Sequence, residues 1–301
     1  MEFPDEGKLV DESSLVPPDL SCIHSLYPVG YDFYFPRTDS TWRMGQIQTE
    51  KVRNHEQMEG DIEEATGVCV ATLVDVPSPS MKAIIKIKLQ SVASHRTASR
   101  ASRILRLTPW DEPEFEGVSM EANREINNLN TLTGRGTQCT PELIDYVLGK
   151  QDPHGYVPGG YVVIILMEKV PGRNLANFHT FPLEKRDRVR IAFAKALMEF
   201  RGYGFDHYGP GRRNLIWDDE SQKCFIVDLE DVRYCGIESP SFYPWEDFSM
   251  WRLHSRELRN IHDHENDDPM IPNDPHEAAL KDEETLYRRL GWKKEVHGKD
   301  A

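Results

Sequence analysis

The sequence predicts an α+β protein with two lobes, in which a small antiparallel sheet with one helix precedes a mainly helical lobe. Three observations predict this class. Strand-like segments fill the stretch 46–92, an amphipathic segment follows at 118–132, and helical periodicity begins after Pro171-Gly172. The expected divisions are an N-terminal arm or tail over 1–45, a sheet lobe with one helix over 46–170, and a helical lobe with a C-terminal helix over 171–301.

The composition indicates a globular protein and argues against some classes of binding partner. The chain has 301 residues, 39% of them hydrophobic, and a formal net charge of −14. This apolar content is enough for a sizeable core, and the acidic balance argues against nucleic acid, whose phosphates attract clustered Lys and Arg. No segment has the length and hydrophobicity of a signal peptide or a membrane span. We therefore expect a soluble protein of the cytoplasm or nucleus, with no nucleic acid or membrane partner.

The number and spacing of the cysteines are consistent with the cytoplasm or nucleus. The chain has five of them, an odd number, and no two form a C-x-x-C pair. They therefore indicate neither a disulfide framework nor a zinc site, and a reducing environment is expected.

Strand patterns justify the first lobe. Within the arm, an acidic start leads to the aromatic segment LYPVGYDFYF, which we expect to dock on the body. GQIQTEKVR alternates polar and apolar residues, VCVATLVDV is rich in β-branched residues, and MKAIIKIKL alternates around a buried stripe. PSPS (77–80) reads as the hairpin connection between the last two strands, and the basic, Ser-rich stretch 94–106 reads as an exposed linker.

One helix and two more strands complete this lobe. Met120, Ile126, Leu129 and Leu132 recur at helical spacing. LIDYVLG and YVVIILMEKV follow as strands, and the second is nearly all apolar, which favours a central place in the sheet.

The second lobe is justified by helical spacing. Apolar residues recur along the segment 189–200, FIVDL is a short buried strand, and WEDFSMWRLHSRELRNI is helical again. Asp274 and Glu277 form a capping pair with Pro275 at the first helical position, which predicts a last helix to about Leu290.

Several residues of these elements suit phosphoryl transfer, which requires neutralised charge, a metal and a positioned acceptor. Lys86 in A-I-I-K stands between two isoleucines, so it shares the opposite strand face with Lys88. Glu125 on the predicted helix is a carboxylate that can pair with Lys86. Asn214 and Asp228 flank short strands and offer oxygen ligands for a metal ion.

Together these segments resemble the eukaryotic protein-kinase-like fold superfamily over roughly residues 60–260, especially divergent branches related to aminoglycoside phosphotransferases. A-I-I-K resembles V-A-I-K, Glu125 matches the helix glutamate, and Met167-Glu168-Lys169 resembles the hinge that receives an adenine edge. G-F-D-H-Y-G-P-G-R-R-N aligns without a gap with G-I-V-H-R-D-L-K-P-E-N, and D-L-E aligns with D-F-G.

This resemblance implies a bilobal protein-kinase-like fold that uses ATP and Mg²⁺ as cofactors. The residues that it assigns to nucleotide binding are Lys86, Glu125, Glu168, Lys169, Asn214 and Asp228. Those that it assigns to the metal are Asn214, Asp228 and Glu230.

The departures from the family pattern fall on residues that carry out the transfer. The catalytic-base aspartate of the family falls on Gly209 and its catalytic-loop lysine on Gly211. Glu230 replaces the glycine of the metal-binding triplet, and only Gly67 matches the glycine-rich phosphate loop. Because a positioned base contributes about 10²–10⁴-fold in rate, we expect ordinary hydroxyl phosphorylation to be impaired.

Neighbouring residues offer compensation for the missing base. Asp206 and His207 are candidates for an unconventional base, although the loop histidine of the family usually has a packing role. Arg212 and Arg213 are candidates for neutralising a phosphate.

Three functional hypotheses follow. The first is a catalytically impaired, pseudokinase-like protein that binds ATP or a related phosphorylated small molecule in an interlobe cleft and acts through protein partners. The second is an active atypical phosphotransferase, acting on protein or small molecules with a displaced base. The third is a repurposed cleft or an interaction scaffold without a nucleotide.

Overall fold

The structure, a computed structural model, describes residues 22–55, 62–74, 81–91, 117–236 and 241–253. It divides into two compact units. Unit 1 contains Met1–Thr133 and Glu142–Lys169, and unit 2 contains Gly134–Pro141 and Val170–Ala301. Within the described ranges, no helix has the length and apolar character needed to cross a bilayer.

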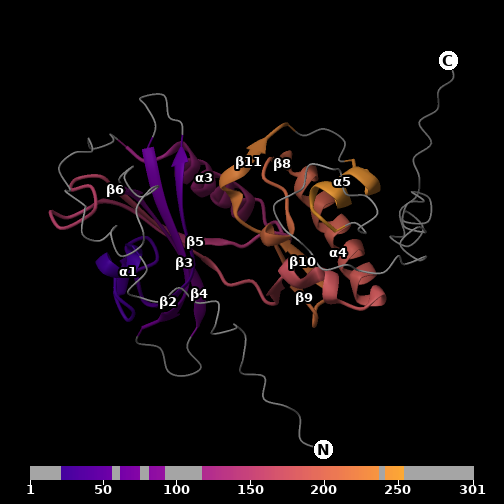
Figure 1. The fold of residues 1–301 in the computed structure, drawn as a ribbon, viewed down its shortest axis with the longest axis horizontal. Coiled ribbons are helices and arrows are strands. Elements are labelled where there is room, and N and C mark those ends of the chain that lie inside the picture. The colour runs from indigo at the N-terminus through magenta and orange to yellow at the C-terminus, as the bar shows by residue number, and fades with distance from the viewer. Residues whose placement is uncertain (1–21, 56–61, 75–80, 92–116, 237–240, 254–301) are drawn as a thin grey trace, which may run out of the picture. The chain divides into compact units, whose positions relative to one another are not determined.

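Unit 1 is built on a six-stranded antiparallel sheet with the strand order β1-β2-β3-β4-β6-β5 (Figure 1). The strands are β1 (Asp32–Phe35), β2 (Ser40–His55), β3 (Ile62–Leu73), β4 (Lys82–Ser91), β5 (Leu143–Lys150) and β6 (Tyr161–Glu168). The helices in the described part of unit 1 are α1 (Cys22–Leu26) and α3 (Met120–Gly134). The aromatic segment that we expected to dock on the body contributes to α1 and β1.

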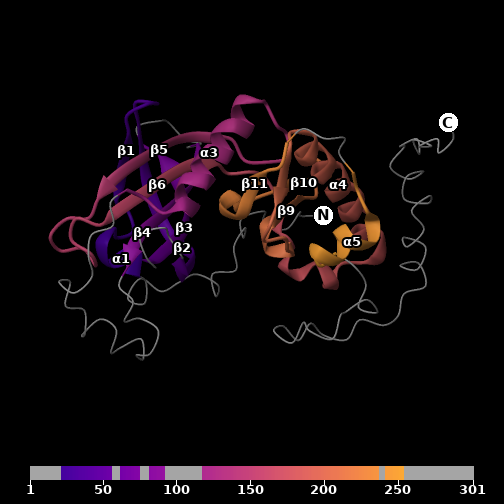
Figure 2. The ribbon, with the colours of Figure 1, turned by 90° about the horizontal axis from the view of Figure 1, so that it is seen from above.

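The sheet of unit 1 is nearly closed, because the turn after β1 is tied to β5 on the other edge (Figure 2). The buried carboxylate of Asp145 accepts hydrogen bonds from the backbone N–H of Thr38 at 3.0 Å and from its hydroxyl at 3.1 Å. The guanidinium of Arg37 lies 3.9 Å from the same side chain. These contacts join the two edge strands, so the sheet curls into a barrel-like shape.

Because side chains alternate between the two faces of a strand, every second side chain points into the interior of this curved sheet. Ile85, Ile87 and Leu89 of β4 are fully buried. Ile23 of α1 packs against β3 at Gly67, where an added Cβ would lie 2.4 Å from the Cδ1 of Ile23. The glycine therefore makes room for a core side chain.

The described residues of unit 2 form helices and two small sheets. One sheet has the order β10-β9-β7 and the other pairs β11 with β8. Its strands are β7 (Arg173–Asn174), β8 (Phe205–His207), β9 (Leu215–Asp218), β10 (Lys223–Ile226) and β11 (Val232–Tyr234). Its helices are the α-helices α4 (Leu183–Gly202) and α5 (Pro244–Met250) and the 3-10 helices η4 (Leu175–Thr180), η5 (Arg212–Asn214) and η6 (Leu229–Asp231). Phe193 of α4 contacts the rings of Phe242, Phe248 and Trp251, which forms an aromatic core.

The predicted fold class, a bilobal protein-kinase-like fold with a mainly helical second lobe, is wrong. Strand exceeds helix in the part of the chain that the structure describes, at 38% against 30%, and the six-stranded sheet is nearly closed. The error has a physical cause. The strands of unit 2 are two to four residues long, and periodicity cannot distinguish such short strands from loops.

Some expected elements cannot be compared with the structure. The PSPS connection, the basic stretch 94–106 and the last helix to about Leu290 lie outside the described residues.

Candidate functional site

Two lysines and two glutamates are buried together in unit 1. Lys86 and Lys88 alternate with the core isoleucines of β4, so they project from the opposite face of the sheet. Lys86 is 4% exposed and Lys88 is 0% exposed, and their partners Glu125 and Glu64 are equally well buried. Four ionisable side chains thus occupy a place where a core would normally be apolar. We call them the buried charge cluster.

The structure brings together Lys86 and Glu125, the pair that the sequence analysis singled out. The ammonium Nζ of Lys86 lies 2.7 Å from the Oε1 of Glu125, a short, charge-assisted hydrogen bond. Lys86 sits mid-strand, opposite Val68 of β3 and Ile165 of β6. Two neighbouring strands therefore fix the lysine backbone, while α3 presents the carboxylate.

Lys88 has its own carboxylate, which the sequence analysis missed. Its Nζ lies 3.1 Å from the Oε1 of Glu64 on β3 and 3.6 Å from the Oε2 of Glu125. The sequence does contain a signal for this pair: Glu64 lies near the start of β3, and alternation places it on the same strand face as Thr66, which pairs with Lys88. The register that matches β3 to β4 cannot be read from one sequence, so the partner was not identified.

Glu64 is held by neutral donors as well. Its carboxylate accepts hydrogen bonds from the hydroxyl of Ser119 at 2.5 Å, from the phenol of Tyr161 at 2.9 Å and from the hydroxyl of Thr66 at 3.3 Å. Burial, together with the charge of Glu64, raises the pKa of Tyr161, so the phenol stays protonated and donates. The Lys88–Glu64 pair is therefore a fixed part of the unit.

Stability alone is a weak explanation for the buried charge cluster. Moving ions out of water is costly, and replacing a buried ion pair by well-packed apolar side chains is often neutral or stabilising. Buried ionisable groups with specific charge partners occur frequently at functional sites. Chemically, the cluster can offer an ammonium group to an anion, in surroundings where water does not screen the interaction.

The predicted hinge residues Glu168 and Lys169 lie at the end of β6 and directly after it, and their role in nucleotide binding stays a prediction. The backbone N–H of Glu168 donates to the carbonyl of Glu142 at 2.8 Å, and the Glu168 carboxylate accepts from the backbone N–H of Glu142 at 3.3 Å. This reciprocal pair already uses the backbone N–H of Glu168. Lys169 follows as the last residue of unit 1 and is half-buried.

Gly209, which occupies the place of the catalytic-base aspartate in the kinase resemblance, lies next to a carboxylate. An added Cβ at Gly209 would be 3.0 Å from the Oδ2 of Asp231. The side chain of Asp231 therefore lies next to the space that a side chain at position 209 would use. Spacing along the sequence does not predict this proximity, because Gly209 and the η6 residue Asp231 lie on separate segments of the chain.

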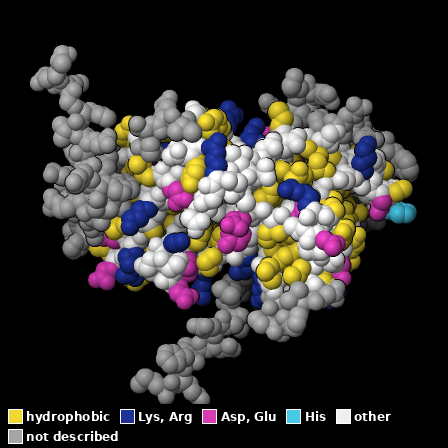
Figure 3. Space-filling view, turned by 180° about the vertical axis from the view of Figure 1, so that it is seen from behind, with side chains coloured by type: hydrophobic (Ala, Val, Ile, Leu, Met, Phe, Trp, Pro, Cys, Tyr) yellow, Lys and Arg dark blue, Asp and Glu magenta, His cyan; other side chains and the backbone are white. Residues whose placement is uncertain are grey.

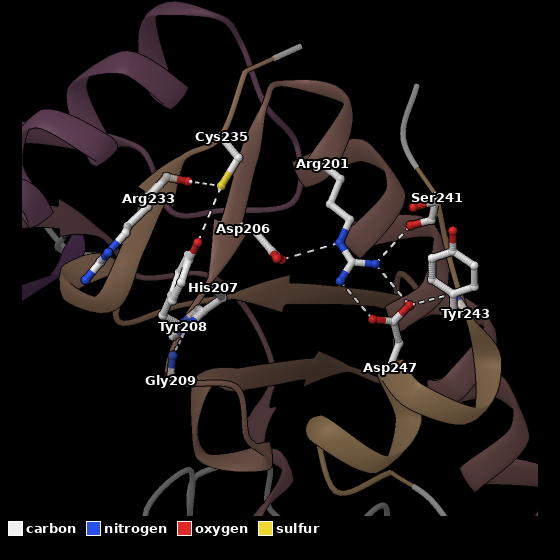
Figure 4. Close-up of polar contacts among 10 residues, drawn as sticks. All are labelled: Arg201, Asp206, His207, Tyr208, Gly209, Arg233, Cys235, Ser241, Tyr243 and Asp247. Atoms are coloured by element: carbon white, nitrogen blue, oxygen red, sulfur yellow. Dashed lines mark hydrogen bonds and ion pairs between the residues drawn. The ribbon is translucent and has the colours of Figure 1, made fainter. Parts of the chain in front are cut away.

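His207 is buried and takes part in a hydrogen bond with Gly209, which Figure 4 shows. Its Nδ1 accepts the backbone N–H of Gly209 at 3.1 Å, and its ring meets the ring of Trp251 edge-on with centroids 5.2 Å apart. Burial lowers the pKa of His207, although the charge of Asp228 opposes the shift. An imidazole whose basicity is lowered by burial, and whose Nδ1 already accepts a hydrogen bond, is poorly suited to act as a base.

Asp206 is engaged by an arginine (Figure 4). Its Oδ1 lies 3.4 Å from the Nε of Arg201. The same guanidinium makes two hydrogen bonds to the buried Asp247, at 2.8 and 3.0 Å, and one to the carbonyl of Ser241. Asp206 thus belongs to the periphery of an ion-pair network that connects α4 to α5.

The predicted metal residues lie on two linked segments of unit 2. The amide nitrogen of Asn214 donates to the carbonyl of Gly209 at 2.8 Å, which leaves its oxygen as the atom suited to a metal ion. The backbone N–H of Val227 donates to the carbonyl of Asn214 at 2.9 Å. Asp228 adopts a left-handed conformation with φ 64° directly before η6, in which Glu230 is buried. Amide and carboxylate oxygens fit Mg²⁺ in kind, and their role as ligands stays a prediction.

Arg212 and Arg213 lie at η5. The Nη1 of Arg212 is 3.4 Å from the Nδ1 of His179, and Arg213 is exposed, with its carbonyl bound by the Asn174 side chain. Their role in phosphate binding also stays a prediction. Gly67 lies inside β3, paired with Ile87 of β4, and therefore not in a phosphate-binding loop.

No protein-family model matches this sequence, and no curated protein matches it either. A function for this protein therefore has to be inferred from the geometry of the residues described above.

Proposed function

We propose that the protein binds a phosphate-bearing small molecule, with ATP as the leading candidate, through Lys86, and acts through protein partners with little or no phosphoryl transfer. The buried ion pair between Lys86 and Glu125, at 2.7 Å, carries this proposal. Glu125 holds the ammonium in place before a ligand arrives, and such preorganisation reduces the cost of binding.

Lys86 is the better suited of the two buried lysines. It keeps 4% of its surface exposed, whereas Lys88 has none. An ammonium carries three N–H donors, so a single lysine can serve a carboxylate and a phosphate together.

Weak transfer chemistry is supported by the residues around Gly209. That position has no side chain, His207 is buried with a lowered pKa, and Asp206 is engaged by Arg201. None of these three supplies a well-placed base, and a base is worth about 10²–10⁴-fold in rate.

Recognition of the phosphates is better supported than recognition of adenine. The N–H of Glu168 is used by Glu142, so the hinge contact implied by the kinase resemblance lacks one of its donors. We therefore expect inorganic tripolyphosphate to compete with ATP.

A protein partner is supported by apolar surface on unit 1. Exposed large hydrophobic side chains in its described part are Val29, Tyr31, Tyr34, Val52, Met81, Met120 and Leu148. Figure 3 shows hydrophobic side chains gathered over unit 1, toward the right of that view. Large apolar patches on a soluble surface often mark interaction sites.

Ligand binding can be tested by thermal shift and calorimetry with MgATP and with tripolyphosphate. A ligand at 100 times its Kd stabilises the folded state by about 2.7 kcal/mol. We expect this shift for the wild type and its loss in Lys86→Met/Glu125→Gln, which removes both charges together. Lys82→Met, an exposed lysine on the same strand, is the matched control. No binding by the wild type, or equal losses in both variants, would contradict the proposal.

A second candidate, slow phosphoryl transfer with a displaced base, is favoured by one observation, the carboxylate of Asp231 beside Gly209. Turnover of MgATP that Asp231→Asn abolishes without weakening ATP binding would support it. Turnover that is absent, or unchanged in this variant, would exclude Asp231 as the base.

A further inference from the structure

The two lysines of the buried charge cluster share one carboxylate. Glu125 contacts Lys86 through Oε1 at 2.7 Å and Lys88 through Oε2 at 3.6 Å. The two contacts use different oxygens, so they do not compete for the same atom. Glu125 therefore has Lys88 as a second cation beside it when a ligand draws on the charge of Lys86.

Lys88 is held independently of Lys86. Its ammonium lies 3.1 Å from Glu64, which also accepts hydrogen bonds from Ser119 and Tyr161. Both side chains of the Lys88–Glu64 pair are 0% exposed. A ligand that engages Lys86 would consequently leave the Lys88 ammonium between Glu64 and Glu125.

An anionic ligand creates a specific electrostatic problem at this site. A phosphate bound to other N–H donors of Lys86 shares the positive charge that now compensates Glu125, and a buried carboxylate with too little positive charge beside it is strongly destabilised. Lys88 can reduce that penalty by shortening its 3.6 Å contact with Glu125. Affinity for the ligand would then depend on a residue that never touches it.

We propose that Lys88 is a positioning residue, which neutralises Glu125 and so allows Lys86 to bind the phosphate of a ligand. This inference rests on the proposed function and assigns a role to the second ion pair. Lys86 is the group that contacts the ligand, and Lys88 acts only through Glu125.

A double-mutant cycle on ligand affinity tests this role, with MgATP and tripolyphosphate as probes in calorimetry. Lys88→Met should weaken binding about tenfold, which corresponds to about 1.4 kcal/mol. The same change should have little effect in a Glu125→Gln background, because no carboxylate remains for Lys88 to neutralise. Independent effects that multiply in the double variant would overturn the proposal, since non-additivity reports coupling between the two side chains.

Glu64→Gln provides a readout that a merely structural role would not give. With Glu64 neutral, Lys88 can turn wholly to Glu125, so binding should become tighter. Weaker binding in both Glu64→Gln and Lys88→Met would show that the cluster only maintains the fold, and would contradict the inference.

Two controls keep the outcome interpretable. If Lys88→Met does not fold, Glu64→Gln/Lys88→Met removes the charges of the whole pair and should weaken binding to the same extent. If the wild type itself binds neither probe, the proposed function fails, and with it the basis for this inference. Binding by the wild type with additive effects refutes the role of Lys88 alone.

Discussion

Replacing Lys86 by Met tests how strongly the buried charge cluster holds unit 1 together. The substitution removes the 2.7 Å partner of Glu125, whose side chain is only 2% exposed. Breaking a buried pair in this way typically costs about 3–5 kcal/mol, because a buried charge loses its compensation. Lys88 remains 3.6 Å from the same carboxylate, so we expect a loss of unfolding free energy near the lower limit, about 3 kcal/mol.

Urea denaturation followed by circular dichroism measures this loss, and hydrogen exchange of α3 localises it. Lys86→Met/Glu125→Leu should recover most of the stability, because an apolar pair replaces the ionic one. Lys82→Met, at an exposed position of the same strand, should change stability by less than about 0.5 kcal/mol. A loss for Lys86→Met as small as that of Lys82→Met would refute the view that Glu125 depends on this lysine.

Three further perturbations test other parts of the structure. Gly172→Ala should cost at least about 2 kcal/mol in urea denaturation, because residue 172 has φ +103° and its Cβ would lie 2.1 Å from the carbonyl oxygen of Trp217. Asp145→Ala should cost about 1–3 kcal/mol in the same assay, because it leaves two donors of Thr38 at the closure of the sheet without their acceptor. Burial lowers the pKa of His207 below its ordinary value of 6.5. As the pH drops below 6.5, the imidazole is therefore protonated in the unfolded state before it is protonated in the folded state, and the free energy of unfolding should fall. His207→Asn should remove this part of the pH dependence.

Each of these expectations has a contradicting result. A tolerated alanine at position 172 would mean that the backbone there can relax. Wild-type stability in Asp145→Ala would mean that the edge strands do not depend on this carboxylate. An identical pH profile for wild type and His207→Asn would mean that the imidazole titrates alike in both states.

The sequence was informative where long strands and one helix create strong periodic patterns. Alternation along MKAIIKIKL correctly put Lys86 and Lys88 on the face opposite the core isoleucines. The helical spacing that placed Glu125 on α3 also agrees with its observed bounds. The pairing of Lys86 with Glu125 followed from these two elements and from the family pattern.

The rest depended on contacts that a single sequence does not encode visibly. The Lys88–Glu64 pair requires the register of β3 against β4, and the closure of the sheet requires Asp145 to meet a turn 107 residues away. The short strands of unit 2 gave no periodic signal, so the kinase resemblance determined the predicted fold class, and this class was wrong. Gly67 illustrates the same point, since its neighbour Ile23 comes from a helix that the sequence analysis placed in the arm.

The most direct test of the central claim is a structure of the wild-type protein with tripolyphosphate bound. We expect a phosphate oxygen within hydrogen-bonding distance of the Lys86 Nζ, and a Lys88–Glu125 contact shorter than its present 3.6 Å. Phosphate bound elsewhere, with the 2.7 Å Lys86–Glu125 contact unchanged, would contradict the account.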